Sequence, residues 1–424
     1  MDLVLRIKRK TQCEWAILYA IFLPFTFGLL LDGLGVSTLI KYTIDFAWLF
    51  LMFVMIIKRI ALPNQETKRL LLIVMLFFVV TWFGSIVALQ SPLYYLWGFR
   101  NNFRFLVLFF ACTIFLRHES IGGYLRIFDV LFYINFPVCL YQFFVLGYSQ
   151  DYLGGIFGVH KGCNGTLLVF FSIIIARSVL QYMNHKESFL LCGAKCCMAL
   201  LVSVFAELKV FFIVLLLVIS LGAILTDFSF KKYILCILAA VAVTVAARLL
   251  GMIFTYFTDW FNLQSILKYI SSTNGYAGTG DLNRLTGISI VWERFLTTAW
   301  EKLFGLGLGN CDTSAFSIVN TPFYEQHGYL HYNWFSATFM FLETGVAGLL
   351  CYFVFFLQVF IQSVKVKRAN KQRTLDCQLA QVLAVVSLLV IVYNSSLRTE
   401  AGYMMYFGLA LPFVKDRTPA SLTG

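Results

Sequence analysis

The sequence predicts an all-α integral membrane protein with about twelve membrane-spanning helices and one large helical loop on the outer side of the membrane. Two observations lead to this prediction. The chain of 424 residues is 60% hydrophobic and only 13% charged, with a mean hydropathy of +0.81, and a soluble domain could not cover that much apolar surface. Apolar runs of about 20 residues also recur along the chain, the length that crosses a bilayer as a helix.

The apolar runs divide the chain into three parts. Residues 1–254 hold nine predicted spans, residues 255–333 form the outer loop, and residues 334–424 hold three spans and an inner C-terminus. The basic start, MDLVLRIKRK, precedes a long apolar run without a small-residue cleavage site, so it is interpreted as an inner flank and not as a removed signal peptide. The predicted spans are 12–31, 42–57, 70–89, 103–116, 125–147, 165–183, 189–206, 208–226, 232–254, 334–362, 377–396 and 400–414.

The basic residues predict the orientation. They concentrate in short loops such as 58–69 and 365–373, which a twelve-span topology with both termini inside places on the inner side, as the positive-inside rule requires. The formal net charge of +12 is therefore attributed to membrane orientation and not to nucleic-acid binding. One long helix over 189–226 would reverse every later span and put KVKRANKQR outside, so we predict two short helices that turn near Glu207, where Glu207 and Lys209 could pair.

The loop 255–333 is predicted to fold as a cap on the outer membrane face. It is neither of low complexity nor rich in proline. Its stretch LNRLTGISIVWERFLTTAWEKL repeats apolar residues at helical spacing. The residues at that spacing are Leu285, Ile288, Val291, Phe295 and Leu296. No internal sequence repeat is found, so nothing indicates a repeat-built transporter.

Five arginines on the predicted outer side are candidates for binding an anion: Arg100, Arg104, Arg284, Arg294 and Arg398. One interpretation is ordinary anchoring at the membrane interface. The other is a clamp for a diphosphate, because a guanidinium is always charged and can give two parallel hydrogen bonds to phosphate oxygens. On one continuous helix Arg284 and Arg294 would lie about 15 Å apart, which fits two lipid-linked molecules, or two parts of one, better than a single phosphate.

Three features near the end of the loop could carry chemistry. GLGLGN at 305–310 is interpreted as a turn with left-handed backbone angles, since it lacks the strand and the Lys-Ser/Thr of a phosphate-binding P-loop. His327 and His331 are spaced to share one helix face. They lack an evident third metal ligand, so a general base or a plain interfacial histidine is preferred to a metal. Glu343 lies about nine residues into a predicted span, where a carboxylate needs a partner arginine or a wet cavity.

Most of the eleven cysteines lie within apolar runs and are interpreted as small apolar helix residues. No pair of C-x-x-C motifs indicates zinc. Cys163 and Cys311 are the two that the topology places clearly outside, and in an oxidising compartment they could form a disulfide between two outer loops.

Several motifs, taken in their order and spacing, resemble those of the O-antigen polymerase and O-antigen ligase superfamily of bacterial envelope polysaccharide assembly. A late, large outer loop is itself one of the features shared with that superfamily, and the sharp motifs cover only about 305–348. In chain order the motifs are RNNFR at 100–104, AELKVFF at 206–212, Arg294 with Gly305, GLGLGN at 305–310, His331 with Asn333, and Glu343 with Gly345. The family often has His directly followed by Asn, whereas Tyr332 intervenes here, so which histidine is functional stays open.

The resemblance implies a GT-C-type glycosyltransferase in the bacterial inner membrane, with its large loop in the periplasm. Its donor would be a glycan on undecaprenyl diphosphate, and no metal, nucleotide sugar or other cofactor would be needed. The acceptor would be another lipid-linked repeat unit in a polymerase of O-antigen or capsule-type polysaccharide, or the lipid A core in a ligase that completes lipopolysaccharide. A chain-length regulator and a flippase would be its protein partners.

With this chemistry the candidate residues take two roles. The catalytic candidates are His331, Glu343, Arg284 and Arg294, with His331 as base and Glu343 orienting it or holding an arginine. The candidates for binding the diphosphate are Arg100, Arg104 and Arg398. Aromatic residues of the same segment, Tyr329, Tyr332 and Trp334, could stack on sugars or anchor at the lipid headgroups.

Two other classes of protein remain open. A transporter or flippase of the lipid-linked oligosaccharide should carry more polar residues through the middle of several spans, whereas the ionisable residues here crowd the outer ends. A purely structural scaffold fits poorly with Glu343 in an apolar span.

Overall fold

The computed structural model describes residues 10–59, 62, 64–227, 230–254, 280–314 and 316–415, and these residues form helices and loops without any strand. The prediction of an all-α protein is confirmed. Every predicted span contains a helix. In chain order the main helices are α1 (Gln12–Phe22), α2 (Thr43–Ile57), α3 (Gln65–Val87), α4 (Pro92–Phe115), α5 (His118–Phe144), α6 (Asn164–Met183), α7 (Phe189–Phe205), α8 (Lys209–Leu225), α9 (Phe230–Ile253), α11 (Gly287–Arg294), α12 (Ala299–Phe304), α13 (Pro322–His327), α14 (Ser336–Ala369), α15 (Thr374–Tyr393) and α16 (Ala401–Ala410).

Several of these helices are suited to a membrane. Seven helical segments of the described chain are long and apolar enough to cross one: Thr38–Ile57, Gln65–Val87, His118–Phe144, Asn164–Met183, Lys232–Ile253, Ser336–Ala369 and Lys371–Tyr393. The shorter apolar helices are Phe189–Phe205, Lys209–Leu225 and Ala401–Phe413. The chain is therefore a multi-pass membrane protein of α-helical type.

Local sequence explains where several helices begin. Thr11 and Glu14 form a capping box, with Thr11 N donating to Glu14 Oε2 at 2.8 Å and Glu14 N donating to Thr11 Oγ1 at 3.2 Å. Asn64 caps α3, and its side-chain oxygen accepts from Thr67 N at 3.0 Å. Pro92 opens α4 in the first turn, where its missing N–H costs nothing.

The predicted turn near Glu207 is confirmed. Helix α7 ends at Phe205 and α8 begins at Lys209. Between them Glu207 takes a left-handed backbone angle, with φ of 54°. The Lys209 ammonium lies 3.0 Å from the Glu207 carboxylate. A left-handed residue stops a helix sharply, so residues 189–226 form two short helices and not one long one.

The connections gather at two ends of the bundle. At one end, which we call the large-loop end, residues 280–335 meet the segment that follows α15. Ser336 N donates to Asn394 O at 3.1 Å, and Arg284 Nε donates to Tyr393 O at 2.9 Å. These contacts put the large loop beside the end of α15 and the start of the loop 394–400.

The opposite end joins the other set of connections. His118, at the start of α5, lies 2.9 Å from Asp376 at the start of α15. Lys367, near the end of α14, donates to Leu225 O at the end of α8, at 2.9 Å. The starts of α5 and α15 and the ends of α8 and α14 therefore lie together at this end of the bundle.

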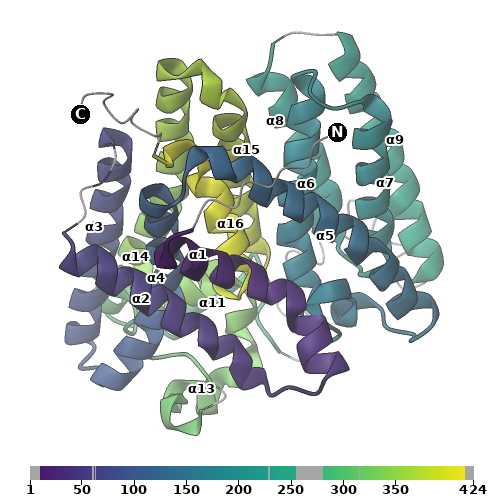
Figure 1. Ribbon diagram of the computed structural model, residues 1–424. Helices are drawn as coiled ribbons and strands as arrows, with labels where there is room; N and C mark the ends of the chain where they lie inside the picture. Colours follow the sequence, from purple (N-terminus) through teal and green to yellow (C-terminus); the bar gives the residue numbers. More distant parts are fainter. Residues whose placement is uncertain are drawn as a thin grey trace, which may run out of the picture.

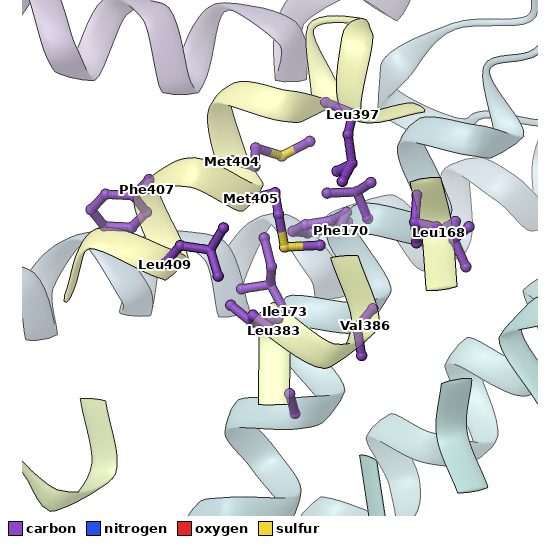
Figure 2. Packing of buried hydrophobic residues seen from close by; sticks show 14 of the residues in the cluster. Leu168, Phe170, Ile173, Leu383, Val386, Leu397, Met404, Met405, Phe407 and Leu409 are labelled. Atoms are coloured by element: carbon purple, nitrogen blue, oxygen red, sulfur yellow. The ribbon is translucent and has the colours of Figure 1, made fainter. Parts of the chain in front are cut away.

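Helix α16 occupies the centre of the bundle. In Figure 1 it lies, with α15, between the group of α3, α4 and α14 and the group of α6 to α9. All ten of its residues are buried. Figure 2 shows Met404 and Met405 of α16 close to Phe170 of α6, while Phe407 of α16 points to the other side, where its ring centre lies 5.9 Å from that of Phe128 on α5. Ten residues make a helix about 15 Å long, too short for a bilayer core of about 30 Å, but longer neighbours enclose it.

Candidate functional site

A break in α14 positions the glycine loop, which we define as residues 305–310. Gly345 interrupts the helix with φ of 60° and ψ of −163°. The N–H groups of Leu306 and Gly307 donate to the carbonyls of Leu342 and Glu343, each at 3.0 Å. The loop thus satisfies carbonyls close to the break, where regular helical bonding is interrupted.

Glycine is required where the loop meets the break. A Cβ atom on Gly345 would lie 2.5 Å from the Leu303 carbonyl, and one on Gly305 would overlap the backbone of Glu343. Gly305, Gly307 and Gly309 all have positive φ. The interpretation of GLGLGN as a left-handed turn is confirmed, and the turn is docked on α14.

Glu343 holds this loop. Its side chain is fully buried, and its Oε1 accepts from Cys311 N at 3.2 Å. Its Oε2 has no hydrogen-bond partner among the residues that the structure describes. No hydrogen bond joins Glu343 to His331 within the described chain, and the two predicted roles of Glu343, orienting His331 or holding an arginine, stay predictions. A buried carboxylate with one unsatisfied oxygen is costly, which is typical of a functional position.

Arg104 and Arg398 lie together at the large-loop end, and we call them the arginine pair. Arg104 Nη2 donates to Arg398 O at 3.0 Å. The Arg398 guanidinium lies 3.6 Å from the centre of the Phe339 ring, and that of Arg104 lies 4.6 Å from the Phe105 ring. Stacking on aromatic rings fixes the plane of a guanidinium before any ligand arrives.

The arginine pair keeps unused hydrogen-bond donors. Arg104 is only 2% exposed. Its Nη1 is 3.8 Å from Glu400 Oε1, and Arg398 Nη2 is 3.6 Å from Asp312 Oδ2. Both distances exceed those of a charge-assisted hydrogen bond. Within the described chain, Nε and Nη1 of Arg104 and Nε of Arg398 have no acceptor. Buried donors of a charged group need an acceptor, so these three atoms favour binding an anion or water here.

Arg100 is held differently. Asp45 accepts from its Nε through both carboxylate oxygens, at 3.1 and 3.0 Å, and its Nη2 lies 2.9 Å from Asp45 Oδ2. Its Nη1 donates to Asn101 Oδ1 at 2.6 Å. The structure therefore places Arg100 beside the arginine pair but with its guanidinium occupied by Asp45.

Arg284 and Arg294 do not share one continuous helix. The apolar spacing predicted a helix through both, but Arg284 lies in a turn and α11 starts at Gly287. Arg284 bonds to Tyr393 O, and its guanidinium lies 4.2 Å from the Tyr393 ring centre. Arg294 is exposed in the last turn of α11. The backbone bond from Leu282 N to Leu330 O, at 2.8 Å, draws this segment to another part of the loop and overrides its helical spacing.

The two histidines also do not share a helix face. Helix α13 ends at His327, whose ring packs against Phe295 and Phe323 with ring centres 5.0 and 4.8 Å apart. His331 has φ of 51°, between two 3-10 turns, and stacks on Trp334 with ring centres 4.0 Å apart. The predicted shared face is wrong. No group of three metal-binding side chains occurs in the part of the chain that the structure covers.

Tyr332 and the two outer cysteines differ from their predicted roles. Tyr332 is buried, and its hydroxyl donates to Cys311 O at 2.6 Å, so it packs the loop and presents no face to a sugar. Cys163 and Cys311 are both free and buried. The Cys163 thiol donates to Asp151 O at 3.4 Å. The predicted disulfide is not formed.

Three carboxylates that contact the arginines were not identified from the sequence as their partners: Asp45, Asp312 and Glu400. Glu400 comes directly before α16, and its Oε1 lies 3.8 Å from Arg104 Nη1. Its place two residues after Arg398 was the only signal in the sequence, while Asp45 lies 55 positions from its partner Arg100.

No protein-family model matches the chain, and no curated protein matches it.

Proposed function

We propose that this protein is a polysaccharide polymerase of the bacterial inner membrane. It transfers a growing O-antigen or capsule-type glycan from undecaprenyl diphosphate to another lipid-linked repeat unit. In this proposal the chain crosses the membrane twelve times with a GT-C-type arrangement, both termini are cytoplasmic, and the large-loop end faces the periplasm. The proposal rests on the resemblance of the sequence motifs, on the multi-pass helical fold and on the arginine pair.

The arginine pair is the observation that supports the proposal most. Displacement of diphosphate from an anomeric carbon moves negative charge onto the leaving phosphoryl oxygens. Fixed cations in a site shielded from water stabilise that charge. Arg104 and Arg398 are buried, stacked on aromatic rings, and keep three donors without an acceptor in the described residues. They can perform this task without a metal.

The proposed base is His331, which would accept the proton of the attacking sugar hydroxyl. It is half-buried at the large-loop end and is held by the stack on Trp334. The proposed role of Glu343 is to anchor the glycine loop beside the arginine pair, through its bond to Cys311 N. Arg284 and Arg294 would act on the glycan or on a second lipid-linked molecule: Arg284 bonds to Tyr393 O at the end of α15, and Arg294 is exposed on α11.

Deletion of the gene in its host tests the proposal. A strain without a polymerase should carry single repeat units on its surface lipid in place of a ladder of lengths, and the wild-type gene should restore the ladder. Loss of all glycan from the lipid A core would instead indicate a ligase. Failure of lipid-linked repeat units to reach the outer leaflet would indicate a flippase. An unchanged ladder would contradict all three.

A further inference from the structure

Asp312 is the carboxylate through which the outer loop reaches the arginine pair. It lies two residues after the glycine loop and is only 8% exposed. Its Oδ2 accepts from Asn101 Nδ2 at 2.7 Å and lies 3.6 Å from Arg398 Nη2. Its Oδ1 accepts from Thr313 N at 2.9 Å. The carboxylate is therefore held mainly by neutral donors and is aimed at a guanidinium.

The contact between Asp312 and Arg398 is an incomplete ion pair. A charge-assisted hydrogen bond between these groups is normally about 2.7–2.9 Å long, and Asp45 reaches that range with Arg100. At 3.6 Å, Asp312 neutralises the charge of Arg398 without satisfying its donors, and Arg398 Nε lacks an acceptor within the chain as described. An anion with more oxygen atoms could make the bonds that this carboxylate does not.

We propose that Asp312 is an internal anion that competes with the ligand's phosphoryl group for Arg398. The inference rests on the proposed function in taking an organic diphosphate as the ligand. When a phosphoryl group binds Arg398, it takes the guanidinium from the Asp312 carboxylate, which keeps its bonds to Asn101 and Thr313. The affinity for diphosphate is then set by the difference between two interaction free energies: that of the phosphoryl group with Arg398 and that of the Asp312 carboxylate with Arg398.

The competition has a structural consequence for the outer loop. Asp312 O accepts from the Thr321 hydroxyl at 3.2 Å, and the neighbouring Cys311 N is bonded to Glu343. Loss of the contact between Asp312 and Arg398 therefore acts on a segment that is hydrogen-bonded to Thr321 and to Glu343. In this proposal, ligand binding at the pair and the position of residues 311–314 are coupled.

The test is the binding of inorganic pyrophosphate to purified full-length protein in detergent, measured by calorimetric titration at low salt. D312N keeps the shape and the acceptor oxygen but removes the charge. It should bind pyrophosphate about tenfold more tightly than wild type, the effect of one partly screened charge contact. D312E keeps the charge and should not show the gain. R398Q combined with D312N should abolish it, because the competition acts through Arg398.

The outcomes separate this inference from the proposed function. If D312N binds pyrophosphate no more tightly than wild type, the proposed role of Asp312 is overturned. If binding is in that case still lost when Arg104 or Arg398 is replaced, the proposal that the arginine pair binds an anion stands. No binding to any variant overturns both. D312S provides the same charge removal if D312N does not fold, as judged by its melting temperature.

Discussion

Substitution of Gly345 by alanine should undock the glycine loop. The residue has φ of 60° and ψ of −163°, a region that is essentially restricted to glycine and costs about 1–3 kcal/mol for other residues. The added Cβ would lie 2.5 Å from the Leu303 carbonyl, and such overpacking costs about 1–3 kcal/mol more. The two terms give about 2–6 kcal/mol, comparable with the whole stability of many domains. We expect a clear drop in melting temperature and loss of pyrophosphate binding.

The matched control is G193A. Gly193 lies within α7, and a Cβ there has no neighbour within 4 Å. Alanine is favoured over glycine in a helix by about 0.5–1 kcal/mol, so this variant should melt at or slightly above the wild-type temperature. Both variants are measured in detergent by tryptophan fluorescence during heating. Equal melting temperatures for G345A and wild type would refute the account of the break in α14.

Four further predictions follow from single contacts. E301A should destabilise α12 by about 1 kcal/mol. Burial disfavours charge on the Glu301 carboxylate, but hydrogen bonds from Thr298 and Thr297 outweigh burial and lower its pKa. The stabilisation is therefore present above the unfolded pKa and is lost as pH falls through the folded pKa, and a difference in melting temperature between wild type and E301A that does not shrink in acid would contradict this prediction. Y332F should cost about 1 kcal/mol by removing the bond to Cys311 O, and an unchanged denaturation midpoint would argue against that bond. The double variant C163S/C311S should migrate like wild type on a non-reducing gel, since both thiols are free; a shift in wild type alone would show a disulfide. H331A should lose polymer while keeping the wild-type melting temperature, and a normal ladder would remove His331 as the base.

The sequence was sufficient for the fold class and for two local features. Composition and apolar run length require a membrane bundle. The charge of the segment after α14 was enough to prefer a turn at Glu207 over one long helix, and the turn is present. Three glycines in five positions predicted left-handed angles, which all three adopt. Each of these inferences depends either on a property of a few neighbouring residues, as for the glycines, or on a sum over a segment, as for hydropathy and charge.

The site could be predicted only in part, because its contacts join distant segments. The arginines were visible as charges on outer loops, but their carboxylate partners Asp45 and Asp312 come from elements that no spacing relates to them. The helical spacing of 285–296 is real, yet α11 begins only at Gly287, because the bond from Leu282 to Leu330 holds the preceding residues in another direction. His331 takes a left-handed angle, which histidine tolerates better than most residues, and this removes it from the face of His327.

The central claim is that the arginine pair stabilises a departing diphosphate. The most direct measurement is polymer formation by purified protein from lipid-linked repeat units extracted from the deletion strain, with no ion gradient. R104Q and R398Q should each reduce polymer formation at least about a hundredfold, the loss typical of a group that stabilises transition-state charge. R126Q, which changes an exposed arginine on α5, should polymerise like wild type. Normal polymer from folded R104Q and R398Q would contradict the account.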